Sequence, residues 1–169
     1  FQLYEIDVSL VASVLRALAD NFPDYAIYAA TDSDLLIVAG DAETLAVVPG
    51  VRLGDGTLEV QIAGAPRAGT EAGGARGFVG LAFRLQKDPL RYECFYLRPT
   101  NGRADDQLRR NHTTQYVSHP DYPWHRLRKE SPGVYESYVD LAPGEWTGVK
   151  IVVSGTEARL FVHGTDQPS

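Results

Sequence analysis

The sequence predicts a mainly β protein: an antiparallel sandwich with a short α/β segment at its N-terminal end. Residues 44–169 contain several short β-prone runs with regular turn signals between them and no helical repeat longer than one turn, a pattern typical of antiparallel sandwiches and barrels. Residues 1–43 instead combine one helical apolar repeat with β-prone runs on both sides. The charge of the chain also changes where the two segments meet.

The charge distribution supports the division into two segments. Residues 1–44 hold eight acidic residues and one basic residue, whereas residues 45–169 hold the other 14 acidic residues and 15 basic ones. Such a break in composition indicates two pieces of different character. The net charge of −6 argues against nonspecific nucleic-acid binding by the whole chain.

Composition also bounds the class of protein. With 169 residues, 44% of them hydrophobic, the chain is long enough for one domain with a real core. Its single cysteine, Cys94, excludes an internal disulfide. No apolar run approaches the roughly 20 residues that a membrane span needs, and no basic and then apolar leader opens the chain. We therefore expect a soluble protein without a membrane partner.

The first segment predicts the order strand, helix, strand, strand. A β-prone run, FQLYEI, precedes a helix that Asp7 or Ser9 can cap and that Pro23 ends. One apolar face of this helix is formed by Leu10, Val11, Val14, Leu15 and Leu18. Two further β-prone runs, DYAIYAA and DLLIVAG, are joined by the turn-like TDSD.

The second segment predicts a series of short strands. The run GDGTLEVQIAG places Leu58, Val60 and Ile62 on one face. In GFVGLAFRLQ, either Phe78 or the alternate set Val79, Leu81, Phe83 and Leu85 faces inward. The remaining strands are RYECFYLRP, GVYESYVDL, EWTGVKIVVSG and EARLFVHG, with turns at PGEW, SGTE and HGTD. The polar stretch from Arg98 to Arg128 interrupts this series.

Residues 44–169 resemble a known family. The similarity is carried by LGDGTLEV, GARGFVGLAFRLQ, the stretch from Tyr92 to Arg128, and YESYVDLAPGEWTGVKIVVSGTEARLFVHG. These segments are similar to bacterial concanavalin A-like lectin/glucanase domains, which are laminin-G-like jelly rolls. The resemblance implies a two-sheet jelly roll that is commonly attached to sugar recognition or glycan processing. Further strands that such domains usually carry before LGDGT and after VHGTDQPS have no counterpart in the match.

Residues 1–43 resemble a different family. The run from FQLYEID to DLLIVAG is similar to a late fragment of the spermidine-synthase-like Rossmann methyltransferase domain. The glycine-rich nucleotide loop of such enzymes is absent, so the resemblance implies a structural segment and no activity. Because neither family predicts the other as its neighbour, we hypothesise a chimera. Unpaired sandwich edges would then be covered by DLLIVAG or would pair two chains into a homo-oligomer.

The stretch from Arg98 to Arg128 contains the residue types that bind sugars. Aromatic faces pack on the C–H surfaces of sugars, and planar polar groups hydrogen-bond their hydroxyls. We predict a carbohydrate-binding face made by Arg98, Asn101, Arg109, Arg110, Asn111, His112, Gln115, Tyr116, Tyr122, Trp124 and His125. The alternative interpretation is structural: Arg109 and Arg110 pair with nearby acids, and HPDYPWH is a proline-pinned loop whose Trp124 fills the sandwich edge.

Glu93 is the weak candidate for a catalytic residue. It shares a strand face with Phe95 and Leu97, and a carboxyl group among apolar neighbours can serve as a general acid. The interpretation that we favour is a salt bridge to Arg84 or Arg109. We expect Cys94 to be a buried thiol. The histidines of the polar stretch lack the spacing of a zinc site, so neither a metal nor a cofactor is expected.

The sequence therefore predicts a non-catalytic, carbohydrate-binding-like module. The first alternative is a glycan hydrolase of the concanavalin A-like superfamily with Glu93 as its acid. The second is a folded chimeric scaffold that has kept no ligand. Binding of single-stranded nucleic acid is disfavoured, because acidic residues interleave with the basic ones in the polar stretch.

Overall fold

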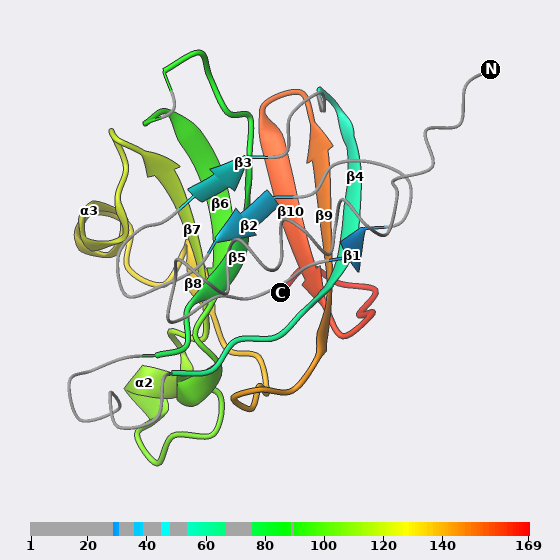
Figure 1. Ribbon diagram of the computed structural model, residues 1–169. Coiled ribbons are helices and arrows are strands. Elements are labelled where there is room, and N and C mark those ends of the chain that lie inside the picture. Colours follow the sequence, from blue (N-terminus) through cyan, green and yellow to red (C-terminus); the bar gives the residue numbers. More distant parts are fainter. Residues whose placement is uncertain (1–28, 31–35, 39–44, 48–53, 67–75, 89) are drawn as a thin grey trace.

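The protein is mainly β in the parts of the chain that the computed structural model describes, which are residues 29–30, 36–38, 45–47, 54–66, 76–88 and 90–169 (Figure 1). These residues form two four-stranded antiparallel sheets and one small two-stranded sheet. Within the same residues, the helices are too short and too polar to cross a bilayer. The expected class, a mainly β protein of the sandwich type, is confirmed, whereas jelly-roll connectivity stays a prediction.

The first sheet has the strand order β1–β4–β9–β10. Its strands are β1 (Ala29–Ala30), β4 (Gly56–Ile62), β9 (Thr147–Ser154) and β10 (Glu157–Val162). Burial alternates along β4, so that Leu58, Val60 and Ile62 are buried between exposed neighbours, as the sequence predicted. The long strand β9 alternates in the same way, as expected for a sheet that buries one face.

The second sheet has the strand order β5–β6–β7–β8. Its strands are β5 (Val79–Phe83), β6 (Tyr92–Leu97), β7 (Thr114–His119) and β8 (Glu136–Ser137). Every residue of β5 is buried. Of the two alternatives for this strand, the set that includes Val79, Leu81 and Phe83 faces the core, whereas Phe78 is 41% exposed.

The two large sheets pack across one hydrophobic core. Ile151 and Leu160 contribute to it from the first sheet, and Leu81 and Leu97 contribute from the second. Figure 1 shows the corresponding strands as two layers. The opposite face of the second sheet carries a smaller cluster that includes Cys94. Cys94 is a free and buried thiol, as predicted.

The stretch from Arg98 to Arg128 is not simply a long loop. It contains the 3₁₀ helix η2 (Pro99–Asn101), the helices α2 (Gln107–Arg110) and α3 (Trp124–Glu130), and the strand β7. The prediction that no helix exceeds one turn is wrong, because α3 has seven residues, with Leu127 buried beneath it. Trp124 is 42% exposed and does not fill the sandwich edge.

Part of the N-terminal segment joins the sandwich. Strand β1, the end of DYAIYAA, pairs with β4 and places Ala29 opposite Gln61. Strand β2 (Leu36–Val38), within DLLIVAG, pairs with β3 (Leu45–Val47) and contacts β5. The predicted helix after FQLYEI lies outside the described residues. Strand β1 therefore extends the first sheet within the molecule, and β2 of DLLIVAG contacts β5, the edge strand of the second sheet.

Candidate functional site

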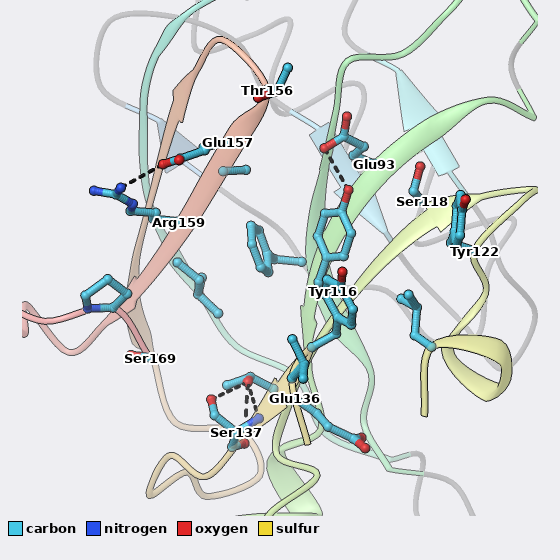
Figure 2. A pocket seen from close by; sticks show the side chains of 18 residues that line it. Glu93, Tyr116, Ser118, Tyr122, Glu136, Ser137, Thr156, Glu157, Arg159 and Ser169 are labelled. Carbon is cyan, nitrogen blue, oxygen red and sulfur yellow. Dashed lines mark hydrogen bonds and ion pairs between the residues drawn. The ribbon is translucent and has the colours of Figure 1, made fainter. Parts of the chain in front are cut away.

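A cleft of about 610 Å³ lies between the two large sheets, where β10 approaches β7 and β8 (Figure 2). One wall is lined from the second sheet and the segments around α3 by Glu93, Phe95, Thr114, Tyr116, Ser118, Tyr122, Leu127, Val134, Tyr135, Glu136 and Ser137. The other wall is lined from β10 and its flanks by Thr156, Glu157, Ala158, Arg159, Leu160, Pro168 and Ser169. Its volume lies within the range usual for small-molecule sites.

Aromatic rings dominate the first wall. The ring of Tyr116 stacks on that of Tyr135 with centroids 5.7 Å apart, and it lies 5.2 Å from the ring of Phe95. Tyr122 is 45% exposed, and the guanidinium of Arg126 lies 4.4 Å from its ring centroid. The strand alternation of β7 points Tyr116 and Ser118 to the same face. The wall thus combines flat apolar surface with hydroxyl groups.

Glu93 lies in a network of donors at one end of the cleft. Nη1 of Arg84 donates to both carboxylate oxygens of Glu93, at 2.9 and 3.0 Å. The hydroxyl of Tyr116 donates to Oε2 at 2.9 Å. Burial, reinforced by the hydrogen bond to Glu93, raises the pKa of Tyr116, which keeps the phenol protonated and donating. The salt-bridge interpretation of Glu93 is confirmed, with Arg84 as the partner.

Strand β10 carries charged side chains of both signs. Nη2 of Arg159 lies 2.7 Å from Oε2 of Glu157, and both side chains are more than half exposed. An exposed ion pair of this kind contributes at most about 1 kcal/mol to folding. Ala158 and Leu160, which alternate with these two residues, face the core. Figure 2 shows the side chains of Glu157 and Arg159 on the side of β10 away from Glu93 and Tyr116, so the ion pair points out of the cleft.

Of the residues that the sequence proposed, Glu93, Tyr116 and Tyr122 line the cleft. Arg109 and Arg110 instead hold the loop around η2 and α2. Nε of Arg109 donates to Oδ1 of Asn101 at 2.9 Å, and Arg110 donates to the carbonyls of Ala104 and Asp105. These contacts agree with the structural interpretation of the two arginines, although their partners are amide and carbonyl groups rather than carboxylates.

The other proposed residues lie away from the cleft. Asn111 is exposed and accepts a hydrogen bond from Nε2 of Gln107 at 2.7 Å. His125 is exposed on α3, with its ring edge-on to that of Trp124. Arg98, His112 and Gln115 belong to a polar network on the opposite face of the second sheet. The sequence stretch is thus divided between two faces of one sheet.

Arg98 is the centre of this second network. Its side chain is buried, and it donates to the carbonyl of His112 at 2.8 Å, to Oη of Tyr96 at 3.0 Å and to Oε1 of Gln115 at 3.1 Å. Asn101 donates to the same His112 carbonyl. Burial raises the pKa of Tyr96 to about 12. Burial also lowers the pKa of Arg98.

Glu136 anchors the edge of the network. Its side chain is 3% exposed and accepts three hydrogen bonds of 2.7 to 3.2 Å from Nε and Nη2 of Arg128. Nδ1 of His112 lies 2.8 Å from Oε2 of Glu136. The imidazole is nevertheless not aligned for a hydrogen bond, and that nitrogen has no hydrogen-bond partner among the described residues. Burial lowers the pKa of His112, against the opposing pull of Glu136.

Acidification is expected to destabilise the protein partly through His112. As the pH falls through 6.5, the ordinary pKa of histidine, His112 of the unfolded chain takes up a proton that the folded protein resists. The free energy of unfolding must therefore fall with the pH there, by at most about 1.4 kcal/mol per pH unit for one group. Thermal unfolding between about pH 7.5 and 5.5 should show a smaller loss for His112→Gln than for the parent. An equal loss in both proteins would contradict the assignment.

Sequence reasoning missed most of the cleft. Tyr135 lies in a run that was expected to be a strand, and Glu157 and Arg159 lie on β10, far along the chain from β7. The alternation of apolar and polar residues in EARLFVHG indicates only which side chains of this strand face outward. Nothing in the sequence showed that β10 would stand opposite Tyr116.

Comparisons of the chain with family models, with curated proteins and with solved structures found no match. Among the residues that the structure describes, no group of three or more His, Cys, Asp or Glu side chains is placed to hold a metal ion. The function is therefore inferred from the chemistry of the cleft.

Proposed function

We propose that the protein is a non-catalytic carbohydrate-binding module whose site is the cleft between the two sheets. The observation that carries this proposal is the aromatic wall of Tyr116, Tyr122 and Tyr135 on one side of a cleft of about 610 Å³, whose other side includes Thr156 and Ser169. Such a combination of flat apolar surface and a few polar groups suits a ligand with one apolar face and many hydroxyls. The resemblance to concanavalin A-like lectin domains supports the same class of ligand.

Each wall has a distinct task in this proposal. The exposed ring of Tyr122 and the Tyr116–Tyr135 stack pack against the C–H face of a sugar ring. On the other side, the lining residues Thr156 and Ser169 carry hydroxyl groups that can hydrogen-bond to the sugar. Ser118 supplies a further hydroxyl on the wall of β7. No cofactor is needed for binding of this kind.

The arrangement of Glu93 favours binding over hydrolysis. Glycoside hydrolysis needs a carboxylic acid that can give a proton to the leaving group and a second carboxylate across the bond. Both oxygens of Glu93 already accept hydrogen bonds from Arg84 or Tyr116. The carboxylate of Glu157 on β10 points out of the cleft (Figure 2) and is paired with Arg159. We therefore assign Glu93 to the support of Tyr116 rather than to proton transfer.

Replacement of Tyr122 by alanine is expected to weaken sugar binding about fivefold, since loss of one aromatic contact costs on the order of 1 kcal/mol. The test begins with thermal unfolding of the parent in a panel of neutral mono- and oligosaccharides. A ligand at about 100 times its Kd adds roughly 2.7 kcal/mol to the free energy of unfolding. The sugar with the largest shift is then titrated calorimetrically into parent and Tyr122→Ala protein.

The matched control is Tyr138→Ala, because Tyr138 is 49% exposed and does not line the cleft. This variant should bind the sugar like the parent. Equal weakening in both variants would place the sugar elsewhere. If no sugar of the panel shifts the unfolding transition, the protein is a folded scaffold without a carbohydrate ligand.

A further inference from the structure

Arg98 carries a buried positive charge and donates no hydrogen bond to a carboxylate among the described residues. The residue is 6% exposed, and the hydrogen-bond partners of its guanidinium within the described residues are a carbonyl, a phenol and an amide, all of them neutral. A charge that is removed from water normally has an opposite charge beside it. The neutral partners hold the guanidinium in place but leave its charge uncompensated.

Among the described residues, the acid that acts on the charge of Arg98 is already paired with a second arginine. Glu136 lies close enough to Arg98 to act on its charge, but its oxygens accept the hydrogen bonds of Arg128. His112, beside Glu136, is favoured in its neutral form by burial. Among the described residues, the network around Arg98, Arg128 and Glu136 therefore has an excess of one positive charge.

Part of this positive charge is accessible to solvent at the guanidinium of Arg128. Its side chain is one-third exposed, and in the described part of the chain its Nη1 has no hydrogen-bond partner. Arg128 belongs to α3, which contacts β7 on the side of the sheet away from β9 and β10 (Figure 1). An anion can reach this guanidinium without entering the cleft.

Aromatic rings flank both arginines. The guanidinium of Arg98 lies 4.9 Å from the ring centroid of Tyr96 and 5.8 Å from that of Phe78. The guanidinium of Arg128 lies 4.9 Å from the centroid of Trp124. Phe78 and Trp124 are each about two-fifths exposed. The same face thus presents apolar rings beside an uncompensated cation.

We propose that this face of the second sheet is a second binding site, which takes a sugar acid through its carboxylate. The carboxylate binds Nη1 of Arg128 and supplies the negative charge that Arg98 lacks. The sugar ring packs against Trp124. The choice of a sugar rather than another carboxylate rests on the function proposed for the cleft, whereas the anion site rests on the charges alone.

The experiment compares three ligands by calorimetry at low ionic strength: galacturonic acid, its neutral counterpart galactose, and acetate. Galacturonic acid is expected to bind at least tenfold more tightly than either of the others. Sodium chloride at about 0.5 M should weaken it, because salt screens a partly exposed charge pair. If galactose bound as tightly as galacturonic acid, the carboxylate would not contribute and the anion site would be wrong. If acetate bound as tightly, the sugar ring would not contribute and the ligand would not be a sugar acid.

A double variant locates the site. Arg128→Gln with Glu136→Gln leaves the net charge unchanged and replaces both members of the ion pair by neutral amides, so the buried Glu136 carboxylate is not left without its arginine. It should lose at least tenfold in affinity for galacturonic acid. The matched control, Arg103→Gln with Asp140→Asn, removes an exposed ion pair in another loop and should bind like the parent.

A Trp124→Ala variant tests the packing of the sugar ring and should weaken galacturonic acid binding severalfold, whereas Trp146→Ala, at an exposed tryptophan outside this face, should not. Unchanged affinity in the Arg128/Glu136 variant, or no binding by the parent, overturns the proposal. Because the cleft is tested with neutral sugars and this face with an acid, failure of one proposal is distinguishable from failure of the other.

Discussion

Replacement of Ile151 by alanine is expected to cost about 2–5 kcal/mol of unfolding free energy, the range for large-to-small changes in a closed core. Ile151 is 0% exposed. It lies on β9, between Leu58 of β4 and Leu160 of β10 in the strand register. Strands on both sides prevent the site from collapsing around the smaller side chain. Urea unfolding followed by tryptophan fluorescence measures the loss.

The neighbouring residue provides the control for this prediction. Val152 is half-buried on the opposite face of β9, so Val152→Ala changes the same strand with less loss of packing. It should cost clearly less than Ile151→Ala. Similar losses for the two variants would mean that the face of β9 that carries Ile151 is not the core of the sandwich.

Replacement of Gly80 by alanine is expected to destabilise the protein by about 1–3 kcal/mol through overpacking. Gly80 lies in β5 opposite Tyr96 of β6. An added Cβ would stand 2.3 Å from the carbonyl oxygen of Phe95 and 2.5 Å from Cβ of Tyr96. The first of these is a backbone atom in the sheet and cannot rotate away. Chemical denaturation of the purified variant gives the change directly.

Gly54→Ala is the matched control, because an added Cβ at Gly54 meets nothing within 4 Å. Its effect should stay within about 0.5 kcal/mol of the parent, as for most surface substitutions. If Gly80→Ala were equally silent, β5 and β6 would have to lie further apart than the structure has them. The distances around Gly80 would then be wrong.

Strands with apolar alternation were predictable, and strands with polar residues on both faces were not. The buried alternate residues of β4 and β5 appear directly in the sequence. Strand β7 was not predicted from the sequence, because its buried residues include the polar residues Thr114 and Gln115. Their polar groups are satisfied by hydrogen bonds that only the folded chain creates. Hydrophobic periodicity carries no signal for such a strand.

The candidate site was predictable only in part, for a related reason. The aromatic and basic residues of the polar stretch were noticed as a group, but neighbours along a strand point to opposite faces. Tyr116 therefore enters the cleft while Gln115 joins the network of Arg98. The second wall comes from β10, and sequence proximity gives no information about a wall that is assembled from distant segments.

Arg84 has a consequence for how the sandwich responds to a ligand. One of its nitrogens bonds the carboxylate of Glu93 in the second sheet, and another bonds the carbonyls of Gly155 and Glu157 beside β10 in the first. The guanidinium of Arg84 thus links the two sheets by hydrogen bonds at one end of the cleft. A sugar that draws Glu93 toward itself must pull on the β9–β10 turn as well. Sugar binding in the cleft should therefore slow the hydrogen exchange of the backbone amides in the β9–β10 turn, even where the sugar makes no contact with that turn.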